Sequence, residues 1–374
     1  MTPGGAGVAQ QHLDPTNSTV VPADAVAGYL RARATEFLRA LRTHRETGGG
    51  AAAGAEESAD AALALRRSAR RISGTLHTFR PLLDTDWSES LRPELAWLAG
   101  TLGREHAYAA RLDRLVSALN RLSGAAPFPA QQAVPARTAT TVAAGGRTAA
   151  RPAASAVGSR PPAAPDRGTL TVGAAKAGAL LDRQLTLART RAHSAALQAL
   201  GSSRFHAVAD SVAVLASEVP LTPAAPTADL RPLAAAAHDR LRDAVTGLPL
   251  HTAGHPYNAE ALIHGLSADT APHPQDAPWH QVRLLLRLHR YALEVLYPEA
   301  VPVDVRLLAA GEALNRHRDA SEAGSAAAAA ARTPRIAPAT AYALGVLHAD
   351  QRHEVEAARF AFQQSWQKEA VSTS

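Results

Sequence analysis

A regular row of arginines lies in one stretch of the chain, between Pro278 and Pro298. Because no residue between these prolines breaks a helix, the stretch predicts a helix of about five turns, roughly 27 Å long. At 100° per residue, five charged or ionisable side chains fall within an arc of about 80°, namely His280, Arg283, Arg287, Arg290 and Glu294. A guanidinium forms paired hydrogen bonds to phosphate oxygens and stays charged at physiological pH, so the row is typical of an anion-binding wall.

The same stretch has a second interpretation as an ordinary surface helix. Val282, Leu286, His289 and Leu293 repeat at spacings of three and four residues and are predicted to face a core. The arginines would then form a solvated face, on which pairs four residues apart, such as Arg290 and Glu294, compensate each other. Both interpretations place Arg283 and Arg287 away from the core.

The composition of the chain indicates an all-α protein. Hydrophobic residues make up 46% of the 374 residues, but aromatic residues only 4%. The core must therefore consist of Ala, Leu and Val, and two of these are strong helix formers. The absence of cysteine excludes disulfides and thiolate metal sites and is consistent with the cytosol. No signal peptide and no run of about 18 apolar residues is present, so we expect a cytoplasmic protein without a membrane partner.

The charge of the chain favours a polyanionic partner. The formal net charge is +6, and all but two of the 39 basic residues are arginine, the exceptions being Lys176 and Lys368. An alternative is a mildly basic protein whose arginine content reflects a GC-rich genome. The low aromatic content argues against base stacking, so nucleic acid would be bound only through its phosphates.

Helical patterns are predicted over residues 24–42, 58–80, 88–124, 172–200, 204–215, 229–245, 278–298, 304–331 and 340–368. Residues 1–22 and an insertion at 125–168, rich in Ala, Pro, Gly and Arg, lack periodicity and are predicted to be disordered.

The helices repeat along the chain. A shift of 217 positions places Arg283 on Arg66 and Arg287 on Arg70, and a shift of 212 places Leu314 on Leu102. The chain is therefore predicted to contain two four-helix-bundle repeats, residues 23–220 and 226–370, joined by short connections. If a pseudo-two-fold axis relates the repeats, the two arginine rows face a shared groove.

Several stretches resemble the CHAD family, the conserved-histidine α-helical domains. Residues 66–83 resemble its first signature helix and residues 279–294 its second. Residues 94–103 resemble the helix that follows the first signature, and residues 314–319 resemble the family's Leu-Gly-x-His-x-Asp element. The resemblance spans residues 24–124 and 172–368, and the order of these motifs, together with the repeat, makes it specific.

The resemblance implies a fold of two four-helix bundles and a basic surface that binds inorganic polyphosphate, without a cofactor or catalytic activity. The matching positions are Arg66, Arg70, Arg71, Arg80, His193, Arg204, His280, Arg283, Arg287, Arg290, Tyr291 and His317, with Asp319 beside them. Four positions at which the family carries His or a basic residue are here Leu63, Ser73, Leu284 and Leu288, and the family's Arg-Asp pair is His106-Ala107.

We therefore expect non-catalytic polyphosphate binding in the cytoplasm, with polyphosphate granules as a candidate location. One alternative is a diverged helical scaffold that has lost strong anion binding, and another is a generic binder of nucleic-acid phosphates. The chain has no phosphate-cradling Gly loop, GxSxG or HExxH motif, which argues against an enzyme. His251, His255, His264 and His273 lack the spacing of a metal site.

Overall fold

The computed structural model describes residues 22–47, 52–124, 167–255, 266, 274–298 and 304–367. Nearly all of the two segments predicted to be disordered, 1–22 and 125–168, lies outside these residues. Within the described part, the secondary structure consists of helices and one isolated β-bridge between Leu83 and Leu221. The all-α prediction is therefore confirmed.

The helices follow the predicted order closely. They are α1 (Asp24–Thr47), α2 (Ala52–Thr78), α3 (Thr85–Ser123), α4 (Arg167–Leu200), α5 (Ser203–Ser217), α6 (Arg231–Thr246), α7 (Leu250–Ala253), α9 (Ala277–Leu296), α10 (Val305–Ala331) and α11 (Pro338–Gln367). Short 3-10 helices occupy Arg80–Leu82, Ala225–Thr227 and Pro274–Asp276. Two differences stand out: α2 begins six residues before the predicted start, because its alanines favour helix, and α7 lies in a stretch predicted to be a loop.

Local sequence signals explain where several helices begin and end. The Asp84 carboxylate accepts a hydrogen bond from the Trp87 backbone N–H at 2.8 Å, and the Ser202 hydroxyl accepts one from the Phe205 N–H at 3.2 Å. Each side chain satisfies an N–H group that the first turn of a helix leaves without a partner. Gly124, with φ of 66°, ends α3 in the left-handed conformation that glycine adopts without strain.

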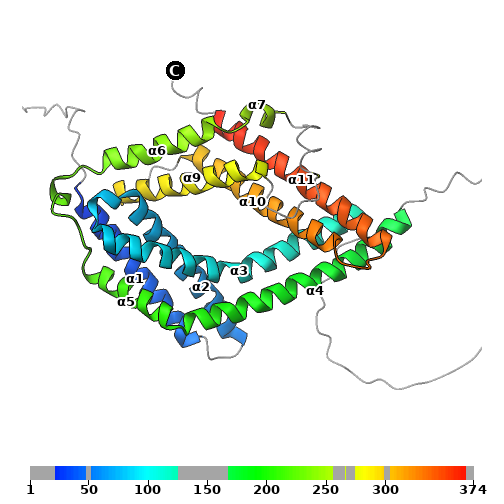
Figure 1. The fold of residues 1–374 in the computed structure, drawn as a ribbon, viewed down its shortest axis with the longest axis horizontal. Helices are drawn as coiled ribbons and strands as arrows, with labels where there is room; N and C mark the ends of the chain where they lie inside the picture. The colour runs from blue at the N-terminus through cyan, green and yellow to red at the C-terminus, as the bar shows by residue number, and fades with distance from the viewer. Residues whose placement is uncertain are drawn as a thin grey trace, which may run out of the picture.

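Figure 1 shows how the helices are arranged, and they pack around three apolar clusters. The first cluster joins α1, α2, α5, the beginnings of α3 and α6, and the end of α9. The second joins the end of α3, the beginning of α4, the end of α10 and the beginning of α11. The third joins α6, α9, the beginning of α10 and the end of α11. Five helices each contribute to two clusters and so connect them, namely α3, α6, α9, α10 and α11.

The second cluster contains helices from both predicted repeats, since α3 and α4 belong to residues 23–220 and α10 and α11 to residues 226–370. Small side chains allow the close packing of α10 on this cluster, because Ala323, Ala327 and Ala330 are fully buried. The division into two repeats about a pseudo-two-fold axis stays a prediction. The two predicted repeats share this second cluster.

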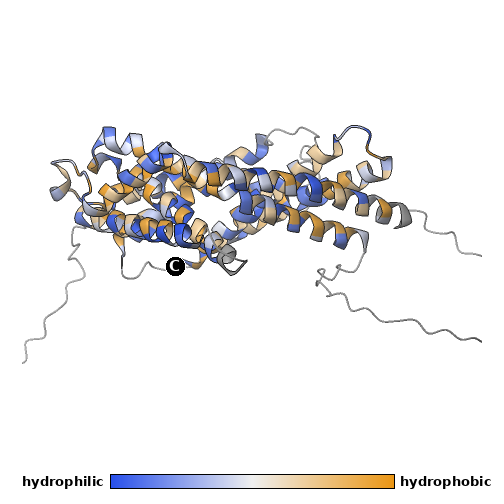
Figure 2. Cartoon of the chain, turned by 90° about the horizontal axis from the view of Figure 1, so that it is seen from below, coloured by the Kyte–Doolittle hydropathy of each residue, from blue (hydrophilic) through white to orange (hydrophobic). Residues whose placement is uncertain are grey.

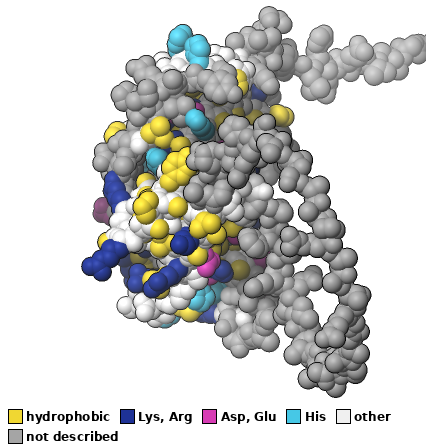
Figure 3. Space-filling view, turned by 90° about the vertical axis from the view of Figure 1, so that its right-hand side faces the viewer, with side chains coloured by type: hydrophobic (Ala, Val, Ile, Leu, Met, Phe, Trp, Pro, Cys, Tyr) yellow, Lys and Arg dark blue, Asp and Glu magenta, His cyan; other side chains and the backbone are white. Residues whose placement is uncertain are grey.

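The surface is mixed in polarity. Hydrophilic and hydrophobic residues alternate along the helices (Figure 2), and basic side chains lie among hydrophobic ones at the right-hand end of Figure 1, seen face on in Figure 3. In the described part of the chain, no helix combines the length and apolar character needed to cross a membrane.

Candidate functional site: an arginine cluster

Helices α2 and α9 pack against each other, and a glycine sets how close they come. A Cβ atom placed on Gly74 of α2 would lie 2.6 Å from Cδ2 of Tyr291 on α9, closer than carbon atoms pack. The tyrosine ring therefore occupies the space that a larger residue at position 74 would fill. This contact positions the two arginine rows, which lie one and two turns before it along α2 and α9.

Five guanidiniums from three helices are close enough to perturb one another electrostatically. This set, called the arginine cluster below, consists of Arg66 and Arg70 of α2, Arg283 and Arg287 of α9, and Arg318 of α10. The structure therefore brings together the four arginines that the sequence repeat aligns in pairs. Arg318 is an additional member that the sequence analysis did not select.

Burial and mutual repulsion disfavour the charges of the cluster. Burial lowers the pKa of Arg70 to about 10 and that of Arg283 to about 9, and neighbouring guanidiniums lower both in addition. The pKa values of Arg66 and Arg287 are lowered for the same two reasons. The pKa values of Arg70 and Arg283 stay above physiological pH, so the site holds concentrated positive charge that a bound anion would stabilise.

The cluster is short of protein counterions. Within the described part of the chain, Arg66, Arg70, Arg283 and Arg287 form no ion pair with a carboxylate. The buried Nε atoms of Arg66 and Arg287 have no hydrogen-bond partner either. Arg318 differs, because its guanidinium pairs with Asp319 and lies 3.9 Å from Glu322 Oε1.

His280 lies beside the cluster, three residues before Arg283 on α9. Burial lowers its pKa, and Arg283 and Arg318 contribute in the same direction, while Asp276 and Glu322 oppose them. Its ring centroid is 5.5 Å from that of His317, and its buried Nε2 has no hydrogen-bond partner among the described residues. His280 is therefore the predicted histidine that accompanies the arginine cluster.

Arg71 and Arg290 are predicted site residues whose charge the protein already compensates. Arg71 Nε donates to Glu294 Oε2 at 2.8 Å, and Arg290 Nε lies 3.5 Å from Glu294 Oε1. The Tyr29 hydroxyl donates to the same carboxylate at 2.7 Å. Glu294 thus ties α1, α2 and α9 together, and Arg71 and Arg290 have less charge to offer an anion than the cluster has.

Three further predicted residues lie in other ion pairs. Arg80 pairs with Glu89 at 3.3 Å near the end of α2. The His193 ring pairs with Glu105 at 2.9 Å, and Arg204 pairs with Glu94 at 2.6 Å while its guanidinium stacks 4.1 Å from the Trp97 ring centroid. The structure does not bring these three residues to the arginine cluster.

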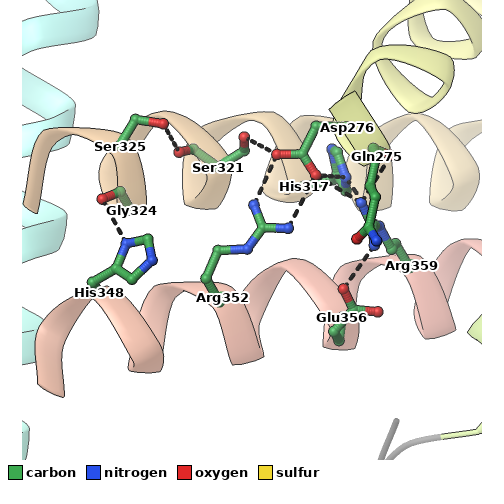
Figure 4. A network of polar contacts seen from close by, with 10 residues as sticks. All are labelled: Gln275, Asp276, His317, Ser321, Gly324, Ser325, His348, Arg352, Glu356 and Arg359. Atoms are coloured by element: carbon green, nitrogen blue, oxygen red, sulfur yellow. Dashed lines mark hydrogen bonds and ion pairs between the residues drawn. The ribbon is translucent and has the colours of Figure 1, made fainter. Parts of the chain in front are cut away.

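His317 lies in the interior, in a network around the buried carboxylate of Asp276 (Figure 4). Arg352 donates to Asp276 through Nη1 at 2.8 Å, Arg359 through Nη2 at 2.7 Å, and the Ser321 hydroxyl at 2.5 Å. Burial alone would raise the pKa of Asp276, but hydrogen bonds from His317, Arg352 and Ser321 hold it well below its usual range. The network connects the start of α9 with α10 and α11.

Sequence reasoning missed this network and Arg318 for different reasons. Asp276 stands directly before α9 and two residues before Pro278, a pattern typical of a helix cap, yet its side chain makes no capping bond and turns to α11 instead. Arg352 and Arg359 are seven residues apart on α11 and share one face, which was a usable signal. No local signal distinguished Arg318 from Arg316, which is exposed two residues earlier.

The buried histidines predict a loss of stability in mild acid. Burial lowers the pKa of His289 to about 4, with a further contribution from His238, and burial lowers that of His317 to about 4. Between about pH 6.5 and 4 the unfolded chain binds protons at these two positions and the folded chain does not. Stability should therefore be independent of these residues above pH 6.5 and fall by about 1.4 kcal/mol per pH unit and residue below it.

Urea unfolding measured from pH 7.5 to 4.5 tests this expectation, with His289→Leu as the variant. Leucine has no titrating group, so the decrease in stability between these pH values should shrink by about 2 kcal/mol. His206→Leu is the control, because His206 is exposed on α5. An unchanged pH dependence in His289→Leu would contradict the assignment.

Comparisons with known proteins agree with this architecture. A family model described as the CHAD domain matches residues 32–328, which is more than half of the chain. The solved structure of PptA from Streptomyces chartreusis is 66% identical and has a TM-score of 0.72, with 92% of this chain and 99% of that chain covered. The comparison with curated proteins finds no match.

The match to the family model begins inside α1 and ends inside α10, so it contains every member of the arginine cluster. It stops before α11, which contributes Arg352 and Arg359 to the Asp276 network. Among the residues that the structure describes, no group of three or more His, Cys, Asp or Glu side chains could hold a metal ion. On the extent of the family match and the 66% identity, the chain belongs to the CHAD domain family.

Proposed function

We propose that this protein binds inorganic polyphosphate, without catalysis, through the arginine cluster. The observation that carries the proposal is the presence of four partly buried arginines from two helices that have no carboxylate partner among the described residues. Like charges held together at partial burial are unfavourable unless an anion neutralises them. The resemblance to CHAD domains names polyphosphate as that anion.

The arrangement suits a chain of phosphates better than one phosphate ion. Arg66 and Arg70 are one turn apart, as are Arg283 and Arg287, so each pair spans about 6 Å along its helix axis. Two such pairs and Arg318 offer contacts to several successive phosphates. Guanidiniums stay protonated and cannot act as a general base, which supports binding rather than hydrolysis. We propose a cytoplasmic location for this function, with polyphosphate granules as a candidate site.

The test is a titration of the full chain with long-chain polyphosphate, tripolyphosphate, orthophosphate and single-stranded DNA and RNA. We expect the long chain to bind most tightly, to remain bound at about 0.15 M salt, and to weaken steeply as salt rises. Orthophosphate should not accumulate during incubation. Absence of polyphosphate binding at physiological salt by folded protein would overturn the proposal and favour a helical scaffold, and equal affinity for nucleic acid would leave a generic polyanion site.

A further inference from the structure

The first arginines of the two rows, Arg283 on α9 and Arg66 on α2, are held in place in different ways. On α9, Arg283 Nε donates a hydrogen bond to Asn315 Oδ1 of α10 at 2.7 Å. On α2, the Nε of Arg66 is buried without a hydrogen-bond partner in the described part of the chain, and its guanidinium lies against Gly103 of α3. A Cβ atom placed on Gly103 would be 2.6 Å from both Cζ and Nε of Arg66. One arginine is thus anchored by a side chain, and the other occupies the space that a missing side chain leaves.

In the alignment of the predicted internal repeat, these two situations correspond. The shift that places Leu314 on Leu102 also places Asn315 on Gly103, and Arg283 corresponds to Arg66. The chain therefore carries two versions of one contact between helices. Asn315 anchors Arg283, whereas Gly103 at the corresponding position leaves room for Arg66.

The chemistry of the anchor matters because Arg283 is surrounded by positive charge. Arg287, Arg318 and Arg70 all disfavour its charge, and repulsion of this kind turns an unanchored guanidinium toward solvent. The neutral amide oxygen of Asn315 holds the Nε of Arg283 in place without cancelling the positive charge of the guanidinium. This bond does not involve either Nη group of Arg283. By contrast, the carboxylate of Glu294 anchors Arg71 but also cancels its charge.

We propose that Asn315 and Gly103 are positioning residues of the polyphosphate site: Asn315 holds Arg283 ready for phosphate as a neutral anchor, and Gly103 leaves the space in which the Arg66 guanidinium reaches the arginine cluster. The inference rests on the proposed function. It assigns neither residue a direct contact with phosphate.

The experiment measures the affinity of the full chain for long-chain polyphosphate as a function of salt. Asn315→Gly removes the anchor and keeps the charge of Arg283, so affinity should fall about threefold to tenfold, the cost of ordering one long side chain. The slope of affinity against salt should not change, since the number of cationic contacts stays the same. Asn120→Gly is the matched control, because it makes the same change near the end of α3, outside the cluster, and should leave affinity unchanged.

Asn315→Asp separates anchoring from charge. The carboxylate keeps an acceptor for Arg283 Nε but neutralises the guanidinium, so affinity should fall and the salt slope should decrease by about one contact. Gly103→Ala should reduce affinity about threefold to tenfold, because the new methyl group displaces the flexible end of Arg66. Its control is Gly100→Ala on the same helix, where a Cβ atom meets nothing within 4 Å, and affinity should not change.

The outcomes distinguish this inference from the proposed function. If the unaltered chain binds polyphosphate and Asn315→Gly and Gly103→Ala bind as it does, while circular dichroism shows them folded, the inference is overturned and the proposed function stands. If the unaltered chain fails to bind at about 0.15 M salt, both are overturned. Equal losses in the variants and in their two controls would also overturn the inference, because they would reflect general helix perturbation.

Discussion

Replacement of Asp276 by Ala should lower the free energy of unfolding by about 3–5 kcal/mol. The carboxylate is fully buried and accepts hydrogen bonds from two arginines that are themselves only 3% and 4% exposed, Arg352 and Arg359. Without it, two guanidiniums remain in the interior with one nearby carboxylate, Glu356, which lies 2.7 Å from Arg359. Breaking a buried ion pair by removing one partner costs far more than the pair contributes.

Urea unfolding followed by circular dichroism measures this loss at pH 7.5. Asp239→Ala is the matched control, because Asp239 is an exposed residue of α6, and its replacement should change stability by less than about 0.5 kcal/mol. A loss below about 1 kcal/mol in Asp276→Ala would contradict the buried network, since it would mean that Arg352 and Arg359 reach solvent.

The second large effect concerns binding. The double variant Arg283→Gln with Arg287→Gln should weaken long-chain polyphosphate binding at least tenfold, on the order of 2 kcal/mol, because it removes two charge-assisted contacts. The salt slope should fall by about 1.4–1.8, since each cationic contact contributes roughly 0.7–0.9. Stability should hold or rise slightly, because the charges removed are partly buried and repel Arg70 and Arg318.

The control for this variant must carry the same change in net charge. Arg39→Gln with Arg42→Gln meets this condition, because both arginines are exposed on α1 and lie outside the arginine cluster. Affinity should fall much less than in the cluster variant. Equal losses in the two double variants would show that net charge alone attracts polyphosphate, and the cluster would have no special role.

The helices could be predicted from sequence because their signals are local. The apolar period of 282, 286, 289 and 293 marks the buried face of α9, and Val282, Leu286 and His289 are buried as this period requires. Prolines and caps such as Asp84 and Ser202 fix helix starts within a few residues. The arginine rows of α2 and α9 follow from the same periodicity, because residues four apart share a helix face.

A charge partner on another helix could not be predicted in this way, unlike the pair of Arg290 and Glu294 four residues apart. Arg71 and Arg287 are both predicted site residues, yet Glu294 compensates Arg71 across 223 positions of sequence. Among the described residues, no carboxylate pairs with Arg287. His317 has the same local context as a surface histidine, but α11 covers it and leaves it 1% exposed. The partner of a charge and the burial of a side chain depend on which helices pack together and on the angle at which they cross.

The sequence by itself determined the all-α class, the positions of the helices, the family and the two arginine rows. Each of these depends on residue types and on their spacing over a few positions of the chain. Only the tertiary structure decided which arginines form one cluster, that Arg318 joins them, and that Arg80, His193, Arg204 and His317 lie elsewhere. The physical reason is that burial and charge compensation come from side chains on other helices. Their approach is set by packing contacts such as that of Gly74 with Tyr291, which join residues far apart in the chain.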